Sequence, residues 1–191
     1  MTLIRIGIVL FLVPHFYSML MPATRDRLKA QFGENAFKGI YALASFLGLG
    51  LIVWGYHAAW AAGEGTANYY DPPAWGRHVT MLFVLMAFIL VGASHGKGHL
   101  RKILRNPMSL GVSLWAAGHL LANGRLIDVT IFGAFLVLGL LDIVLCTLRG
   151  KALDYVPSSR SDVIAVAAGM VLYVIFLFGF HPYVLGLPVV K

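Results

Sequence analysis

Six long apolar stretches limit what this chain can fold into more than any other feature. They cover roughly residues 3–21, 39–60, 78–95, 108–123, 129–148 and 163–186. A transmembrane helix needs about 20 mostly apolar residues. Only 12% of the residues are charged, whereas soluble domains carry about 25%. The sequence therefore predicts an all-α, polytopic membrane protein: a bundle of about six transmembrane helices in a single domain over residues 1–191.

The fourth stretch is the shortest, and its flanking residues support it as a helix. Pro107 suits the first turn of a helix, where a missing backbone N–H costs nothing. Asn123-Gly124 is a good helix stop at the other end. We therefore expect a short helix here.

Lysine and arginine alternate between rich and poor loops, which predicts the orientation. The first, third and fifth loops hold Arg25, Arg27, Lys29 and Lys38, then Lys97, Arg101, Lys102 and Arg105, then Arg149, Lys151 and Arg160. The second and fourth loops hold one each, Arg77 and Arg125. Because cytoplasmic loops are enriched in these residues, we expect the rich loops in the cytoplasm and both termini on the opposite side. The sequence has no run in which basic and aromatic residues alternate, so it gives no indication of nucleic-acid binding.

Most of the seven histidines lie where a functional role is not required. His57 and His78 are near span ends, and His95 and His99 are in a basic loop. His181 precedes Pro182, which predicts the end of the last helix at the outer face. The one cysteine, Cys146, excludes an internal disulfide and any cysteine-based metal cage.

His15 and His119 are different, because each lies within a predicted span. Ionisable residues inside a membrane are costly and mark functional sites by default. Ser18 is one turn from His15, while Ala116 leaves room beside His119. Two interpretations remain open: each imidazole makes a structural hydrogen bond, or the two are axial ligands of a haem held in the helix bundle.

Several motifs resemble the NnrU family of bacterial membrane proteins. They are "VPHFYSM", "RDRLKAQFGENAFKGIYALASFLGLGLIVWGY", "DPPAWGRH", "RNPMSLGVSLWAAGHLLANG" and "HPYVLGLP", which span nearly the whole chain. The resemblance implies a multi-pass protein of the bacterial inner membrane. It also implies a role beside the nitrite and nitric oxide reductase system of denitrification.

A relative of that family, 15-cis-zeta-carotene isomerase, is a membrane enzyme with haem b held by two histidines. Carried over, those ligands fall on His15 of "PHFYS" and His119 of "WAAGH". The predicted cofactor-binding residues are His15, Ser18, Trp115, Ala116, His119 and Asn123, with both histidines on the haem iron. Ala116 stands where the isomerase has a cysteine proposed as a switchable iron ligand. This difference argues against the same redox switching, and with it against isomerase activity on a hydrophobic polyene ligand.

A more distant resemblance supplies a rival. "RNPMSLG" is similar to the "RHPxYxG" signature of isoprenylcysteine carboxyl methyltransferase-type membrane enzymes, which use S-adenosylmethionine. Asn106 replaces the signature histidine, and the paired glutamates expected after it are absent from "LCTLRGKALDYVPSSRSD". That interpretation predicts a cytoplasmic polar pocket near Arg105, Asn106 and Arg149. A third interpretation is a cofactor-free assembly or interaction protein, so the sequence does not decide whether the chain is an enzyme.

Overall fold

The computed structural model describes residues 1–150, 153–187 and 189. Within these residues the chain is helical and has no β-strand. Five helices are long and apolar enough to cross a membrane. Large apolar side chains on them are turned outward, such as Phe46 at 73% and Trp54 at 67% exposed. These features identify a multi-pass membrane protein whose helices contact the lipid bilayer.

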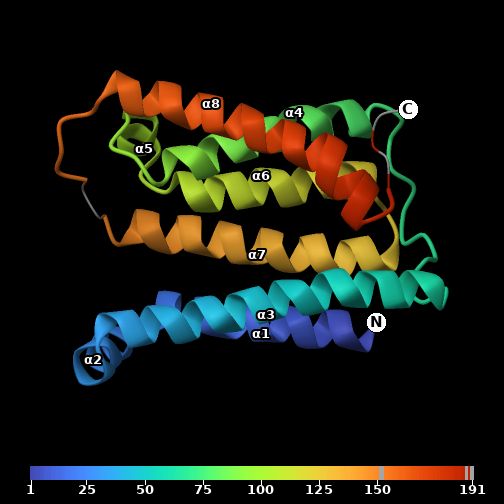
Figure 1. The fold of residues 1–191 in the computed structure, drawn as a ribbon, viewed down its shortest axis with the longest axis horizontal. Coiled ribbons are helices and arrows are strands. Elements are labelled where there is room, and N and C mark those ends of the chain that lie inside the picture. The colour runs from blue at the N-terminus through green and yellow to red at the C-terminus, as the bar shows by residue number, and fades with distance from the viewer. Residues whose placement is uncertain (151–152, 188, 190–191) are drawn as a thin grey trace. The chain divides into compact units, whose positions relative to one another are not determined.

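The chain divides into two compact units, residues 1–67 with 125–127 and residues 68–124 with 128–191. That residues 1–191 form a single domain stays a prediction. In the first unit, α1 (Thr2–Leu20) and α3 (Glu34–Ala61) lie side by side, joined by α2 (Pro22–Phe32) (Figure 1). Their backbones approach so closely that a Cβ atom on Gly7 would lie 2.7 Å from the carbonyl oxygen of Gly48. Small residues at such crossings allow helices to pack closely in membranes.

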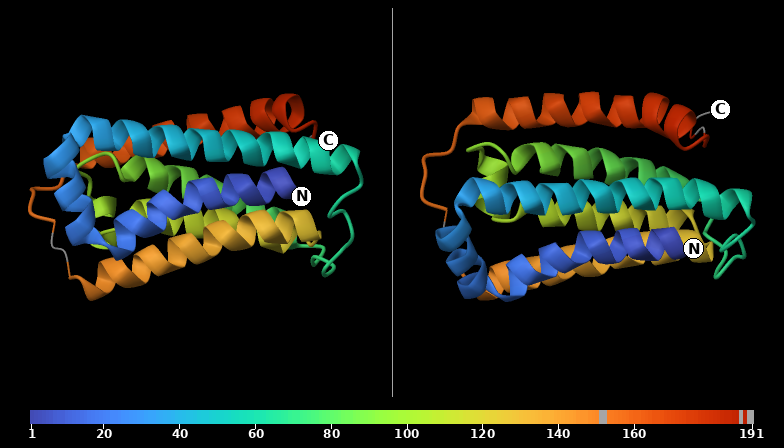
Figure 2. Two further views of the ribbon diagram at one scale, coloured as in Figure 1. Left: turned by 90° about the horizontal axis from the view of Figure 1, so that it is seen from below. Right: turned by 60° about the horizontal axis from the view of Figure 1, so that its bottom comes forward.

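The second unit contains the remaining helices, which Figure 2 shows from two sides. They are α4 (Gly76–Ala93), α5 (His99–Leu104), α6 (Pro107–Ala122), α7 (Leu126–Leu148, from Asp128 on), α8 (Ser159–Ile175) and the π-helix η1 (Phe176–Val184). Helix α4 packs against both α6 and α8. It therefore forms the centre of this unit.

The predicted spans correspond to α1, α3, α4, α6, α7 and α8 with η1, so the prediction of about six helices is confirmed. Helix α6 is the shortest of the six, with 16 residues. Two predicted loops contain helices of their own. Helix α2 begins at Pro22, which suits a first helical position, and α5 lies between α4 and α6.

The sequence predicted that the last helix ends at His181, and this prediction is wrong. The helix continues through Pro182 to Val184 as a π-helix. Proline has no backbone N–H to donate in either helix type, and in a regular α-helix its ring would clash with the carbonyl group four residues earlier. The chain adopts the wider π-helical turn instead, a form that is frequent at functional sites.

Candidate functional site

His15 lies in α1 and is surrounded by aromatic rings of the first unit. Its Nδ1 is 2.7 Å from the carbonyl oxygen of Phe11. Its ring stacks on the Phe11 ring with 4.1 Å between centroids, and the Tyr41 ring is 4.8 Å away. Because a carbonyl oxygen only accepts, Nδ1 must be the nitrogen that donates. In the neutral imidazole, the lone pair is then on Nε2.

Ser18, one turn further along α1, has an unusual hydroxyl group. Its Oγ is buried and has no hydrogen-bond partner among the described residues. Most buried side-chain polar groups have a hydrogen-bond partner, so the Ser18 hydroxyl is an exception. Ser18 is thus the predicted site residue whose polar group lacks a protein partner.

His119 lies near the end of α6 in the second unit. Its Nδ1 is 2.8 Å from the carbonyl oxygen of Trp115, so it has the same tautomer as His15. The Phe132 ring stacks on the imidazole at 4.4 Å between centroids. Trp115 lies at 5.2 Å, and it contacts Phe132 edge-on at 5.0 Å. The imidazole therefore lies in an aromatic cluster built by α6 and α7.

His181 joins this cluster, which the sequence did not predict. The imidazoles of His119 and His181 are nearly parallel, with 6.3 Å between centroids and 10° between planes. The Nδ1 of His181 is 2.8 Å from the carbonyl oxygen of Phe176. The only sequence feature that could have indicated this position is the His181-Pro182 pair, because both residues lie in the π-helix that places His181 beside His119.

The other predicted site residues on α6 have mainly structural surroundings. Ala116 is fully buried. Asn123 ends the helix, because both its backbone N and its Nδ2 donate to the carbonyl oxygen of His119 at 2.9 Å. Trp115 packs on Phe132 and Phe135. Asn123 thus acts as a helix cap in this arrangement.

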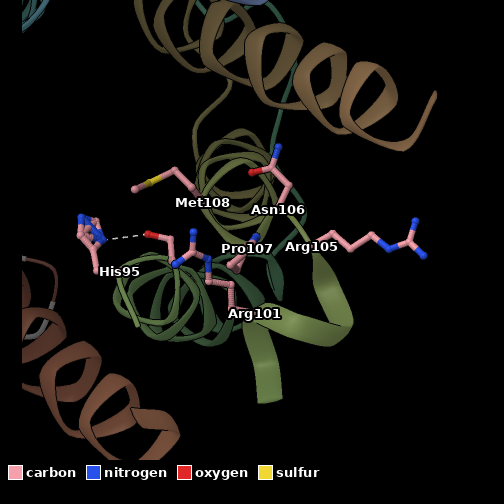
Figure 3. A pocket seen from close by; sticks show the side chains of 7 residues that line it. His95, Arg101, Arg105, Asn106, Pro107 and Met108 are labelled. Atoms are coloured by element: carbon pink, nitrogen blue, oxygen red, sulfur yellow. Dashed lines mark hydrogen bonds between the residues drawn. The ribbon is translucent and has the colours of Figure 1, made fainter. Parts of the chain in front are cut away.

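The second unit also contains a cavity of about 420 Å³ at its α5 end (Figure 3). It is lined by Ser94, His95, Arg101, Arg105, Asn106, Pro107 and Met108. The methyltransferase interpretation predicted a pocket near Arg105 and Asn106. However, Arg149 does not line it, and neither does any acidic side chain.

The structure places the predicted site residues in two separate groups. His15 and Ser18 belong to the first unit, and the four residues on α6 belong to the second. Among residues 1–150, 153–187 and 189, no group of three or more His, Cys, Asp or Glu side chains could hold a metal ion. An axially ligated haem needs only one or two protein ligands, so His15, His119 and His181 remain the candidates for it.

The geometry of an apolar, multi-helix chain with half-buried histidines agrees with one comparison. The model of the family described as "NnrU protein" matches residues 3–189. No curated protein and no solved structure matches the chain. Because the match covers nearly the whole sequence, this multi-pass membrane protein belongs to the NnrU family.

Proposed function

We propose that this protein binds haem b in the bacterial inner membrane, with His119 and His15 as axial ligands. One observation carries the proposal: both imidazoles bind the carbonyl oxygen four residues earlier through Nδ1. Histidines that ligate metals almost always donate their other ring nitrogen in this way, which fixes the tautomer and the ring.

Two further features suit a porphyrin. The donor set is imidazole, a usual axial ligand of haem iron. Aromatic rings surround both histidines, and apolar side chains are typical of cofactor pockets. The unsatisfied Ser18 hydroxyl is available to a propionate or a water molecule on the His15 side. A bound haem would supply one-electron transfer or ligand sensing.

Following the resemblance noted in the sequence, we also propose a role beside the nitrite and nitric oxide reductase system. A polyene-isomerase-like activity is the second possibility for the same cofactor. We also propose that the basic ends face the cytoplasm. These ends are α2 in the first unit and α5 in the second. Both termini would then be periplasmic. A Lys97→Cys, Cys146→Ser variant, which has a single cysteine, tests this orientation. We expect a membrane-impermeant thiol reagent to label it from the cytoplasmic side and not from the periplasmic side.

Absorption spectra of the purified protein, oxidised and then reduced with dithionite, test the haem proposal. We expect a Soret band in the wild type that is lost or shifted in His119→Ala and in His15→Ala. His78→Ala is the matched control, because that histidine is exposed. His181→Ala asks whether the imidazole beside His119 is the second ligand instead.

Each outcome separates the interpretations. Loss of the band in His119→Ala and His181→Ala, with His15→Ala unchanged, would reassign the second ligand. A colourless wild type, even after addition of haem, would overturn the proposal and favour the cofactor-free assembly protein. The S-adenosylmethionine interpretation is disfavoured by the pocket itself, since no carboxylate lines it to balance a cationic sulfonium.

A further inference from the structure

The cavity at the α5 end has no part in the haem proposal, and its lining is strongly basic. Two arginines, Arg101 and Arg105, line it without an acidic side chain. Neither forms an ion pair with a carboxylate of the described residues. Its volume of about 420 Å³ falls within the roughly 300–1,000 Å³ typical of small-molecule sites. An anionic group is the ligand that such a lining favours.

Arg101 is already oriented in the cavity wall. One of its terminal nitrogens donates to the carbonyl oxygen of Gly96 at 2.9 Å. A guanidinium group has five N–H donors in a planar fork, so four donors remain beyond that bond. Figure 3 shows Arg101 on the side of His95 and Met108, whereas the Arg105 side chain extends away from them. Arg101 is therefore the residue placed to bind a phosphate group bidentately.

The segment that carries Arg101 is fixed to the start of α8. The two carboxylate oxygens of Asp162 accept from the backbone nitrogens of His99 at 2.9 Å and Leu100 at 3.1 Å. The same carboxylate contacts Nδ1 of His99 at 2.9 Å. A Cβ atom on Gly98 would collide with Asp162, so only glycine permits this approach. The cavity wall is thus built before any ligand arrives, which lowers the entropic cost of binding.

Exposed apolar side chains on α5, the helix that carries Arg101, favour a lipid over a soluble anion. Ile103 is 75% exposed and Leu104 is 37% exposed, although both lie in the same short helix as Arg101. Helix α5 connects α4 to α6, two of the predicted membrane spans, so we expect it at the membrane surface. A helix with basic and exposed apolar residues at that level contacts headgroups and acyl chains together.

We infer that this cavity is a binding site for the phosphate group of an anionic lipid, with Arg101 as its principal donor. A lipid headgroup and a soluble phosphate could both supply the phosphate group. The exposed apolar residues of α5 favour the lipid as its source. The site is independent of haem, so a failure of either proposal leaves the other standing.

Native mass spectrometry of the full chain in detergent tests this inference. The probes are dihexanoyl phosphatidylglycerol, dihexanoyl phosphatidylcholine and inorganic phosphate. We expect one phosphatidylglycerol to bind per chain, and we expect Arg101→Gln to weaken that binding about tenfold, which corresponds to about 1.4 kcal/mol. Lys97→Gln is the matched control: it removes the same charge from the same loop, but Lys97 does not line the cavity. We expect it to change the affinity less than twofold.

A second variant keeps the test decisive if Arg101→Gln disturbs α5. Met108→Trp fills the cavity without altering any charge, and we expect the same loss of binding. Equal effects of Arg101→Gln and Lys97→Gln, or unchanged binding in Met108→Trp, would overturn the site. Equal affinity for phosphatidylcholine would overturn the preference for an anionic lipid. Competition by inorganic phosphate at the same concentration would overturn the lipid and identify a soluble phosphate.

Discussion

Helix α6 begins among charged side chains and ends among aromatic ones. At its start, Asn106 and Ser109 both donate to one carboxyl group, that of Asp142 on α7. At its end, Tyr70 and Asn123 donate to main-chain carbonyl oxygens, and His119 packs on Phe132. The first end thus depends on one shared acceptor, whereas the second distributes its bonds over several backbone groups.

The two ends of α6 should therefore differ in how well they tolerate substitution. A carboxyl group that serves two donors cannot be lost without leaving both unsatisfied. Backbone carbonyl oxygens remain in place whatever side chain is changed. We therefore expect the start of α6, at Asn106, to be the more sensitive to single substitutions. We expect the other end, at His119, to tolerate changes of side chain better.

Asp142→Ala should give the largest loss of stability. It leaves Nδ2 of Asn106, at 2.7 Å from the carboxylate, and the Ser109 hydroxyl without their acceptor. At about 1–3 kcal/mol for each of the two unsatisfied donors, we expect a loss of roughly 2–6 kcal/mol in the free energy of unfolding, measured by thermal or denaturant unfolding in detergent. Asp154→Ala, at an exposed position, is the control. Similar losses in both variants would contradict the shared-acceptor account.

Tyr70→Phe should weaken the other end by less. The phenol of Tyr70 donates to the carbonyl oxygens of Leu120 and Asn123, the latter at 3.0 Å. We expect a loss of about 1–2 kcal/mol in the same assay. Tyr69→Phe removes a hydroxyl from a side chain that is 74% exposed, and it should have no measurable effect. A loss larger than that of Asp142→Ala would reverse the comparison.

Thr80→Val tests the contact between α4 and α6 near the histidine end. The Thr80 hydroxyl bonds to the carbonyl oxygens of Gly76, at 2.8 Å, and Gly118. Hydrogen bonds between membrane helices average about 0.6 kcal/mol, so we expect a change of that size. Thr147→Val is the control, since Thr147 bonds only within its own helix, to Ile143 at 2.8 Å. A larger loss of stability than in Tyr70→Phe would identify Thr80 as the main contact at this end of α6.

Alkaline pH should produce the smallest effect, again through Tyr70. Partial burial raises the pKa of Tyr70, and the nearby Asp128 carboxylate raises it further. The folded protein therefore holds the phenolic proton more tightly than the unfolded chain, whose pKa is about 10. The resulting stability is complete below about pH 10 and is lost as the pH rises through the folded pKa. The melting temperature should fall less steeply between pH 8 and 11 in Tyr70→Phe than in the wild type. An equal fall in both proteins would contradict this prediction.

Local sequence was enough to predict the helices. The apolar runs, Pro107 at the start of α6 and Asn123 at its end all act on neighbouring residues, and the observed boundaries follow them. The helices α2 and α5 were missed because their apolar content is too low for a span, although Pro22 and the "HLRKIL" segment suit short helices. His15 and His119 could be singled out because hydropathy alone places them inside spans.

The sequence by itself determined the membrane class, the spans and the two histidines within them, because burial in lipid requires long apolar runs that are visible residue by residue. Only the tertiary structure decided that His181 lies beside His119, that Asp142 serves Asn106, and that Asp162 fixes the Arg101 segment. Each of these contacts joins residues far apart in the chain. Their partners are chosen by helix packing and by the π-helical turn at Pro182, which no local pattern specifies.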